Sequence, residues 1–586
     1  MVLFFFMVLG SLLEALGVGL ILPFISIVNN PQDIQSFDLL RRLYEFIQPS
    51  SYRDFLILLS VGLLAVYLFK NLFLLTLYYF KDRFIYNQQA VISRNLLSSY
   101  LYSPYTFHLQ RNTAELIRNI TMSLGAVFGG AIIPFMTILS ELPVIVSISV
   151  LLFVVEPSIT ALICLIIGGL SALFYRYVRK KTGHYGALVQ ETGTSMIMWA
   201  NQSVGGIKEI KIGGKEPFFL DAFSRYRFDN ARANIFFSVI QKIPRLYLEL
   251  ILMGGMLLVL IAIIAQGGRF QEFIPIIAFF GFAALRLNPS VTQIVTSLNA
   301  MKFATAATDD VYRDVRFFRE NEVKAQKCQA GHRELVFDTI EMKDVTYVYS
   351  GSKGPVFENV SLAIGRGQSI AFVGPSGSGK TTLVNIILGL LPPTAGSLLV
   401  GGQNIYGNDL TLRAWQDCIG FVPQDIYLID DSLQHNIAFG IPADEIDVNK
   451  VWDVIGQAHL KKTVKEWPDG IETKVGENGM CLSGGQRQRV NIARALYHDP
   501  SVLVMDEATS SLDTETELEI TRAIEEMSLQ KTIIIIAHRL STVKNCDKLI
   551  FMKDGKIAGS GTFDELVRNN NEFRKMTQLS RFEDAD

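Results

Sequence analysis

The sequence predicts a polytopic α-helical membrane domain over residues 1–320, followed by a linker over 321–335 and an α/β domain over 336–586. Three observations lead to this prediction. The chain is 49% hydrophobic and only 19% charged, and its apolar excess lies before residue 320. That first part contains apolar runs long enough to cross a bilayer. The second part contains short apolar runs that end in a glycine-rich loop or an acidic residue, which indicates buried strands.

Six apolar stretches approach the ~20 residues that a membrane-spanning helix needs. The chain opens on Met-Val-Leu-Phe-Phe-Phe, with neither a charged n-region nor a small-residue cleavage site, so the first stretch is expected to be a span rather than a removable signal. A multi-pass integral membrane protein is therefore expected. The six predicted spans lie at 2–28, 55–80, 124–155, 158–178, 246–266 and 271–296.

Lysine and arginine in the connections predict the orientation of the spans. The stretches 81–118 and 176–232 are rich in both residues, whereas the connections on the opposite side carry almost none. The two basic stretches are therefore predicted to be cytosolic, on the same side as the α/β domain, and to extend from the membrane as helices. Two coupling regions that rest on that domain are expected near 103–113 and 206–217.

A glycine-rich loop marks the first candidate site. Gly374 to Thr382 read GPSGSGKTT, which fits G-x-x-x-x-G-K-[ST], a loop whose backbone N–H groups and lysine cradle nucleotide phosphates. The apolar run before it indicates a strand, and the residues after it indicate a helix whose positive dipole end points at the phosphates. Lys380 is expected to bridge the β- and γ-phosphates, and the Thr381 hydroxyl to ligate Mg²⁺. Alone, the loop indicates ATP or GTP. The loop residues expected to bind nucleotide are Gly374, Pro375, Ser376, Gly377, Ser378, Gly379, Lys380, Thr381 and Thr382.

A second loop, Leu482 to Gln486, reads LSGGQ. With both loops, the chain resembles the ATP-binding-cassette (ABC) family, in which the two loops of opposite subunits close over one ATP. The resemblance implies ATP and Mg²⁺ as ligands, and it implies that Ser483, Gly484, Gly485 and Gln486 complete a partner's site. One nucleotide domain per chain then implies a dimer, a homodimer in the simplest case or a pair with a related half-transporter. The family usually carries a short amphipathic segment before its first span, which is missing here, so a truncated start is one expectation.

Further residues match the family's catalytic set. Asp506 ends an apolar run and is expected to be the carboxylate near Mg²⁺. In the family the next residue, Glu507 here, is the general base for the attacking water. The glutamine that senses the γ-phosphate and the coupling interface is matched by Gln424 in VPQD. Together with Thr381 and Asp506, it is expected to lie at the Mg²⁺.

The rest of the set follows from the same resemblance. Asp513 closes a D-loop that reads SSLD, and His538 in IIIIAHRLST matches the switch histidine. Tyr349 fits the aromatic residue that stacks on adenine, with Tyr347 as the less favoured neighbour. No member of the catalytic set is degenerate, so an active ATPase coupled to transport is expected.

The order of the two parts, membrane domain first and ATPase second, is that of the family's exporters. A soluble ATPase of the same superfamily is excluded by the six spans. A channel gated by ATP is an alternative that no residue separates from a pump. The net charge of −2 indicates no particular partner, and no nucleic acid is expected.

Three cations within or beside spans are candidates for binding cargo, because charge in a membrane is costly and therefore functional by default. They are Lys70, Arg245 and Arg286. If they face a shared cavity, an anionic head group such as a phosphate or pyrophosphate would suit them. Two other interpretations stay open: Arg245 could be neutralised by Glu249 one helical turn away, and Lys70 could snorkel to an interface.

Two acidic residues, Glu14 and Glu141, also lie within spans. They could belong to a proton path, but hydrogen bonding between helices is the expected role, and no part in transport is assigned to them.

The membrane part resembles bacterial flippases for lipid-linked oligosaccharides. The likeness lies in the stretches LEALGVGLILPFIS, GIKEIKIGGKE, PRLYLE and ALRLNPS. In those flippases basic residues engage the pyrophosphate of a polyprenyl-linked glycan. Lys70, Arg245 and Arg286 fall where such residues would lie, although Lys70 replaces an arginine and so loses a bidentate contact. This implies a bacterial cell membrane and a lipid-linked substrate, with peptides or drug-like amphipathic compounds as the alternative cargo.

The outer loop contains a candidate amphipathic helix over 37–47. Its apolar residues at 39, 40, 43, 46 and 47 recur at helical spacing. The helix either lies at the interface and engages lipid tails, as in the resembled flippases, or caps the outer face.

Overall fold

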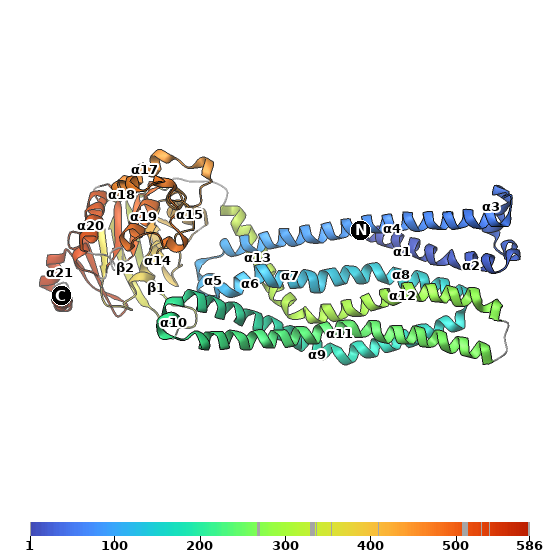
Figure 1. Cartoon of the computed structure of the whole chain (residues 1–586). Coiled ribbons are helices and arrows are strands. Elements are labelled where there is room, and N and C mark those ends of the chain that lie inside the picture. Colours follow the sequence, from blue (N-terminus) through green and yellow to red (C-terminus); the bar gives the residue numbers. More distant parts are fainter. Residues whose placement is uncertain are drawn as a thin grey trace. The chain divides into compact units, whose positions relative to one another are not determined.

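The computed structural model describes residues 2–265, 270–328, 335, 337–352, 354–407, 409–506, 514–528, 530–537 and 539–583 (Figure 1). The chain divides into two units. The first comprises Met1–Ser103 and His108–Asn321, and the second comprises Pro104–Phe107 and Glu322–Asp586. All strands of the described residues belong to the second unit.

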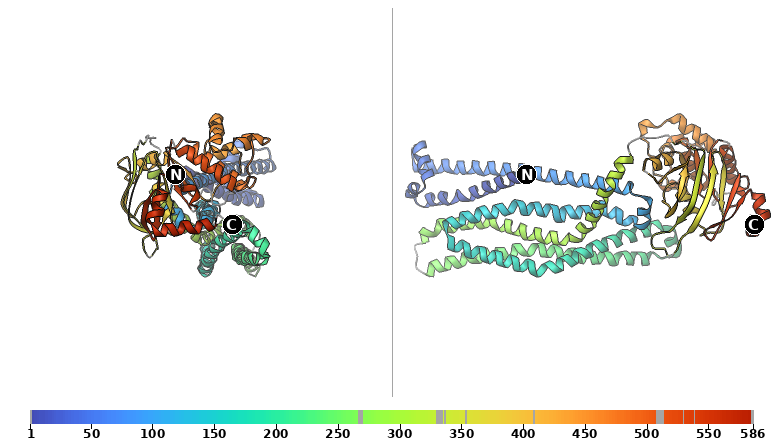
Figure 2. Two further views of the ribbon diagram at one scale, coloured as in Figure 1. Left: turned by 90° about the vertical axis from the view of Figure 1, so that its left-hand side faces the viewer. Right: turned by 180° about the vertical axis from the view of Figure 1, so that it is seen from behind.

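Long helices make up the first unit. Figures 1 and 2 show them running side by side, with α11 packed against α9 and α12, and α8 packed against α1 and α12. The element bounds are α1 Val2–Gly19, α2 Ile21–Asn29, η1 Pro31–Ser36, α3 Asp38–Ile47, α4 Tyr52–Leu101, α5 Tyr105–Gln110, α6 Thr113–Arg118, η2 Asn119–Ser123, α7 Leu124–Val127, η3 Phe128–Ile132, α8 Ile133–Val155, α9 Pro157–Gly205, α10 Ile207–Gly213, α11 Glu216–Ala265, α12 Phe270–Phe303 and α13 Thr305–Cys328.

Apolar faces turned outward explain why these helices belong in a membrane. On α4, Leu64, Leu68, Leu72 and Leu75 follow helical spacing and are all exposed. A stripe of large aliphatic side chains on the outside of a helix bundle fits contact with lipid rather than with water.

Four helical segments of the described residues are long and apolar enough to span a membrane: Val2–Asn29, Tyr52–Leu101, Thr113–Val155 and Thr160–Gly205. They coincide with the first four predicted spans. The predicted spans 246–266 and 271–296 fall on α11 and α12, where many side chains lie outside the described residues. The count of six therefore stays a prediction.

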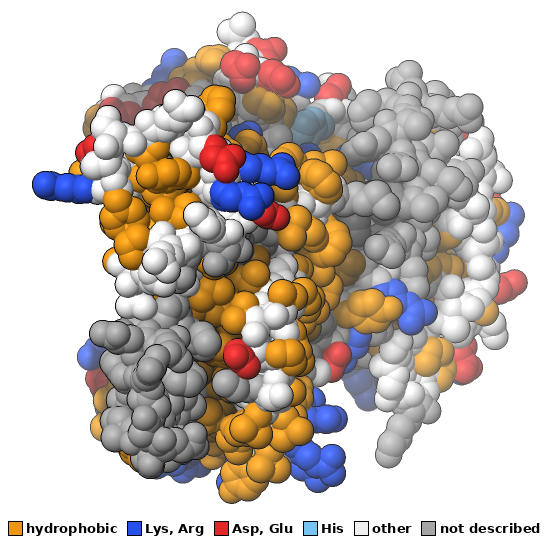
Figure 3. Space-filling view, turned by 90° about the vertical axis from the view of Figure 1, so that its right-hand side faces the viewer, with side chains coloured by type: hydrophobic (Ala, Val, Ile, Leu, Met, Phe, Trp, Pro, Cys, Tyr) orange, Lys and Arg blue, Asp and Glu red, His pale blue; other side chains and the backbone are white. Residues whose placement is uncertain are grey.

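Three short helices lie where the sequence indicated helices or connections. The amphipathic helix predicted over 37–47 is confirmed as α3. Figure 3, which looks at the end of the helical unit that carries α3, shows hydrophobic side chains over much of that face. Helices α5 and α10 lie within the two expected coupling regions. Helix α13 continues to Cys328, so the first part of the expected linker 321–335 is helical.

The second unit contains two sheets. A six-stranded sheet has the order β10-β9-β3-β8-β7-β6, and a four-stranded antiparallel sheet has the order β2-β1-β4-β5. The strands are β1 Thr339–Tyr347, β2 Phe357–Gly365, β3 Ser369–Val373, β4 Ala395–Val400, β5 Gln403–Asn404, β6 Ile419–Val422, β7 Val502–Asp506, β8 Thr532–Ile536, β9 Lys548–Lys553 and β10 Lys556–Gly561. The helices are α14 Lys380–Ile387, α15 Asp409–Asp417, α16 Leu433–Ile437, α17 Val448–Gln457, α18 Lys461–Glu466, α19 Gly484–Leu496, α20 Thr514–Ser528, α21 Phe563–Asn569 and α22 Asn571–Glu583.

The centre of the six-stranded sheet is its most buried part. Every residue of β3, β7 and β8 is buried, and these strands run parallel to their neighbours. Continuous apolar runs are typical of parallel strands that are covered on both faces. Because parallel strands end at the same edge, the residues that follow them are brought together there.

Candidate functional site

Residues predicted from three separate motifs meet at one edge of the six-stranded sheet. Asp506, the last residue of β7, stands opposite Ile536 of β8, and Phe372 of β3 stands opposite the same residue. Gly374 therefore starts the glycine-rich loop at this edge. Gln424 follows the end of β6, the strand beside β7. Ligands of open α/β sheets bind at such carboxyl ends.

Glycines allow the loop after β3 to turn tightly. Gly374 has φ +147°, and a Cβ there would lie 2.1 Å from the carbonyl oxygen of Met552. Gly379, the residue before α14, has φ +97°, and a Cβ there would lie 3.1 Å from the ring of Phe357. Any other residue would be strained at both positions. The loop can therefore bring its backbone N–H groups to the start of α14.

Two polar side chains of the loop fit a phosphate. The buried amino group of Lys380 donates to the carbonyl oxygens of Gly374 at 2.8 Å and of Pro375 at 3.0 Å, so the ammonium lies over the loop. The Ser378 hydroxyl is 3% exposed and has no hydrogen-bond partner among the described residues. An unsatisfied buried hydroxyl beside a lysine at a helix N-terminus suits phosphate oxygens, which accept hydrogen bonds.

Tyr349 lies beside the same helix. Its hydroxyl is 3.1 Å from the Thr382 hydroxyl on α14, and its ring meets that of Tyr347 edge to face with centroids 4.9 Å apart. Tyr347 is buried, whereas Tyr349 is partly exposed. Of the two tyrosines, Tyr349 is thus the one with a face available to a nucleotide base.

The LSGGQ loop opens α19 with a reciprocal cap. The Ser483 hydroxyl accepts from the backbone N–H of Gln486 at 3.2 Å, and the Gln486 side chain accepts from the backbone N–H of Ser483 at 2.9 Å. Ser483 is exposed while Gly485 is buried. This capping box leaves the positive end of a 13-residue helix accessible to an anion.

Arg494, in the last turn of α19, was not singled out by the sequence. Its guanidinium donates to the carbonyl oxygens of Asn436 and Tyr427, both at 2.7 Å, and to Oδ1 of Asn436 at 3.0 Å. Burial lowers the pKa of Arg494 to about 10, which leaves the side chain charged at neutral pH. The arginine therefore ties the segment that follows Gln424 to the helix that begins at LSGGQ. Nothing in the sequence separates it from the other arginines of this helix.

The helical unit contains a charge cluster, which we call the Glu14 cluster: Glu14, Lys70, Glu141, Arg286 and Ser290. Oε2 of Glu14 accepts from Arg286 Nε at 2.9 Å and from Lys70 Nζ at 3.3 Å. Arg286 also lies 3.7 Å from Glu141, whose carboxylate accepts from Ser290 at 2.6 Å. The cluster joins α1, α4, α8 and α12.

The placement of these residues narrows the alternatives for the three candidate cations. Lys70 is 8% exposed and paired with Glu14, so the interpretation that it snorkels to an interface is wrong. Arg245 and Glu249 on α11 are both exposed, and the described residues show no ion pair between them. The structure thus brings Lys70 and Arg286 together and leaves Arg245 outside the cluster.

Comparison with known proteins decides the family. The family model for the ABC transporter transmembrane region matches residues 2–284, and that for the ABC transporter matches residues 357–510. The ATP-dependent lipid A-core flippase of Cupriavidus pinatubonensis is 31% identical over 480 residues, covering 80% of this chain and 78% of the relative. The protein of the same name from Francisella tularensis is 31% identical over 485 residues, covering 81% and 77%. The chain belongs to the ABC transporter family.

As an ABC transporter, the protein is an integral membrane protein whose ATPase activity drives transport. Its fold has a solved counterpart in a bacterial Atm1-family ABC exporter with ATP bound, which has a TM-score of 0.76 and covers 98% of both chains at 21% identity. This likeness concerns the fold: a helical transmembrane domain plus a nucleotide-binding domain.

Three predicted residues of the transporter's catalytic set, Glu507, Asp513 and His538, lie outside the described residues. Tyr349 contacts Thr382 of the phosphate loop, and the strand register places Asp506 and the segment that contains Gln424 at the sheet edge where this loop begins. Ser483 and Gln486 lie at the N-terminus of α19, which forms a separate end that is accessible to an anion.

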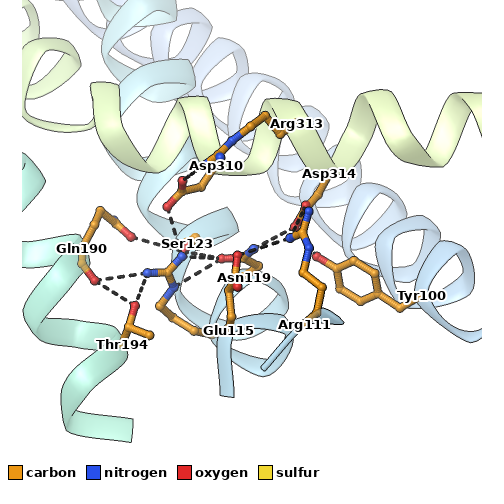
Figure 4. Close-up of polar contacts among 11 residues, drawn as sticks. Tyr100, Arg111, Glu115, Asn119, Ser123, Gln190, Thr194, Asp310, Arg313 and Asp314 are labelled. Carbon is orange, nitrogen blue, oxygen red and sulfur yellow. Dashed lines mark hydrogen bonds and ion pairs between the residues drawn. The ribbon is translucent and has the colours of Figure 1, made fainter. Parts of the chain in front are cut away.

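A second polar cluster of the transporter lies in the helical unit around Arg118, at the end of α6 (Figure 4). Its guanidinium donates to Asp310 of α13 at 3.0 Å, to Asn119 Oδ1 at 2.8 Å and to the carbonyl oxygen of Gln190 at 3.1 Å. It also donates to the Thr194 hydroxyl. Arg118 thus joins α6, η2, α9 and α13.

Asp314 of α13 extends this cluster. It accepts from Asn119 Nδ2 at 2.7 Å, from Arg111 at 3.3 Å and from the Tyr100 hydroxyl (Figure 4). Asn119 belongs to η2, a π-helical turn, and such turns are frequent at functional positions. The sequence does not reveal this cluster, because its residues lie far apart in the chain and form no local motif.

Proposed function

We propose that this transporter is a flippase: an ATP-driven homodimer that moves a lipid-linked substrate with an anionic head group, such as a lipid-linked oligosaccharide, between membrane leaflets. The curated relatives bear the name of lipid A-core flippases, which supports a lipid cargo. The observation that carries the proposal is the Glu14 cluster, in which Lys70 and Arg286 share one carboxylate oxygen among the spanning helices.

The charges of the Glu14 cluster allow a cargo head group to replace a carboxylate as the ion-pair partner of Arg286. Two cations and two carboxylates neutralise each other, which limits the cost of placing charge between apolar helices. Arg286 is the more accessible cation, with 22% of its side chain exposed against 10% for Lys70. A phosphate or pyrophosphate can accept two parallel hydrogen bonds from the planar guanidinium group, just as a carboxylate can. An incoming head group can therefore replace Glu141 or Glu14 as the partner of Arg286.

The nucleotide-binding domain supplies the energy. Lys380, Ser378 and the loop N–H groups hold the phosphates of ATP, and Tyr349 holds the base. The oxygen donors of Thr381, Gln424 and Asp506 are of the type that Mg²⁺ prefers, so these residues would hold the ion. Bound Mg²⁺ neutralises phosphate charge. Glu507 acts as general base on the attacking water, and Asp513 of the D-loop and the switch histidine His538 are the other members of the catalytic set.

The dimer follows from the LSGGQ loop. Its exposed Ser483 and the positive end of α19 face the γ-phosphate of ATP held by a second copy, or by a related half-transporter. In this arrangement each chain contributes six spans, the nucleotide domain is cytosolic, and the protein lies in the bacterial inner or plasma membrane. Helices α5 and α10 transmit the closure of the nucleotide domains to the spans.

The test is the ATPase activity of the purified transporter in nanodiscs with candidate cargoes. We expect a polyprenyl-pyrophosphate glycan to raise the rate several-fold, and an uncharged lipid to leave it at the basal level. Stimulation only by peptides or by uncharged drug-like compounds would instead identify the alternative exporter.

A charge-matched pair of variants separates cargo binding from stability. Arg286→Gln leaves Glu141 without its cation and can destabilise the helical unit. A loss of cargo-stimulated ATPase activity in this variant alone would therefore not separate lost cargo binding from lost stability. Arg286→Gln combined with Glu141→Gln keeps the cluster neutral and should restore the thermal unfolding midpoint, but not the stimulation. Restored stimulation in the double variant would remove Arg286 from cargo recognition.

A further inference from the structure

A cavity of about 1050 Å³ lies between α9 and the junction of α12 with α13, all within the helical unit. The charged residues of its lining are four cations and one carboxylate. The cations are Arg176, Arg179 and Lys180 of α9 and Lys302 of α12, and the carboxylate is Asp309 of α13. This cavity, which we call the basic pocket, is separate from the Glu14 cluster.

Three of the pocket cations are exposed and Lys302 is half-buried, and the four differ in their charge partners from four other cations of the unit. Lys70, Arg111, Arg118 and Arg286 each lie within 4.0 Å of a carboxylate. Among the described residues, none of the four pocket cations forms such an ion pair. Four like charges around one cavity repel each other, and an anion bound between them would relieve that repulsion.

The pocket lies where α9 changes from an apolar to a basic surface. Leu162 and Leu165 are exposed in the apolar stretch, and Tyr177 stands exposed beside the first arginines. Aromatic residues followed by lysine and arginine mark the boundary between hydrocarbon and head groups. Basic pockets between helices at this depth bind acidic lipid head groups.

Close packing of α9 and α12 builds the pocket. A Cβ at Gly183 would lie 2.9 Å from Cε of Lys302, and a Cβ at Gly186 would lie 2.0 Å from the carbonyl oxygen of Phe303. At Gly186 the contact would be with backbone, so only a residue without a side chain allows this approach, whereas at Gly183 the flexible end of Lys302 would have to move. Gly183 thus makes room for the stem of Lys302, the half-buried member of the four, which lines the same cavity as the arginines of α9.

We propose that the basic pocket binds the phosphate-bearing head group of an anionic lipid, with Leu173 and Tyr177 against the apolar part of the molecule. Lys302 and Arg286 belong to the same helix, and 16 residues of α-helix correspond to about 24 Å. The pocket is therefore a second anion site. It lies near the C-terminal end of α12, whereas the Glu14 cluster lies about 24 Å away along the same helix. Its use as a loading site for cargo rests on the flippase function proposed above.

The test uses the full-length transporter and native mass spectrometry to measure the affinity for phosphatidic acid against a background of phosphatidylcholine. Lys180→Gln combined with Lys302→Gln should weaken phosphatidic acid binding about 25-fold, since each cation near a membrane surface contributes about fivefold. The control is Arg225→Gln combined with Arg227→Gln, two exposed arginines of α11 outside the pocket, which changes net charge equally and should leave the affinity unchanged. Equal affinities in the pocket and control variants would overturn the proposal.

A second variant tests the cavity without changing charge. Gly183→Ala should displace Lys302 and weaken phosphatidic acid binding several-fold while the helix remains intact, because alanine favours helix. Inorganic phosphate at millimolar concentration should not compete with the lipid. Full competition would identify a site for free phosphate and overturn the lipid assignment.

The two proposals fail separately. Unchanged lipid binding with intact glycan-stimulated ATPase activity would overturn the basic pocket alone. Weakened lipid binding in a transporter that no lipid stimulates would support the pocket and remove the flippase function.

Discussion

Arg118 and Asp310 lie 3.0 Å apart in the helical unit although 192 residues of chain separate them. Arg313 pairs with the same aspartate from the solvent side. The two arginines thus share one carboxylate in different surroundings: 7% of the Arg118 side chain is exposed, against 71% of the Arg313 side chain.

This difference predicts unequal effects on stability. Arg118→Leu should cost about 3–5 kcal/mol, because it leaves buried polar partners without a donor. Arg313→Leu removes only an exposed ion pair and should cost less than about 1 kcal/mol. Thermal unfolding of the two purified variants checks this, and equal midpoints would show that the Arg118 contacts do not stabilise the unit.

Arg494 is predicted to position the segment after Gln424. Arg494→Lys keeps the charge but cannot make all three hydrogen bonds to Asn436 and Tyr427. We expect kcat for ATP to fall at least tenfold while KM changes little, because Lys380 and its loop remain intact. Arg413→Lys, at an exposed ion pair on α15, is the control and should behave as wild type. A rise in KM with unchanged kcat would contradict the assignment.

Ser483 is predicted to have two separable roles. Ser483→Ala loses the helix cap, at about 1 kcal/mol, together with the ATP contact. Ser483→Asp keeps the cap, since aspartate is an equally good N-cap, but places a negative charge where a phosphate must approach. The Asp variant should therefore unfold like wild type and lack ATPase activity. Activity close to wild type in Ser483→Asp would exclude a phosphate at this helix end.

Cys546 offers a prediction about pH. Burial, with a further contribution from neighbouring Asp547, raises the pKa of its thiol to about 12. Because only the thiolate reacts, maleimide labelling of Cys546 at pH 8 should be slow and should rise about tenfold per pH unit up to the pKa. Labelling followed by peptide mapping, with the exposed Cys481 as internal reference, measures both rates. Labelling of Cys546 as fast as that of Cys481 at pH 8 would show that the thiol is not buried.

The nucleotide site could be predicted from the sequence because its parts are local. GPSGSGKTT lies between an apolar run and a helix, and LSGGQ opens another helix, so each loop carries its own signal. The order of the parallel strands then brings the residues that follow β3, β6 and β7 to one edge of the sheet.

The charged clusters could be predicted only in part, because their contacts join distant positions. Glu14 and Arg286 are 272 residues apart, and no local pattern pairs them. Glu14 was expected to bond between helices, and it does so as the shared acceptor of Lys70 and Arg286. The sequence of α4 allows Lys70 to reach an interface, but its ion pair with Glu14 of α1 holds it among the helices.

The most direct test of the proposed function is translocation in proteoliposomes. Wild-type transporter is reconstituted with a polyprenyl-pyrophosphate glycan, and an enzyme that modifies only the glycan of the outer leaflet reports its arrival there. We predict arrival that requires ATP, and its absence in both Glu507→Gln and the neutral Arg286→Gln, Glu141→Gln variant. Movement without ATP, or ATP-driven movement of a peptide or uncharged compound but not of the glycan, would contradict the proposal.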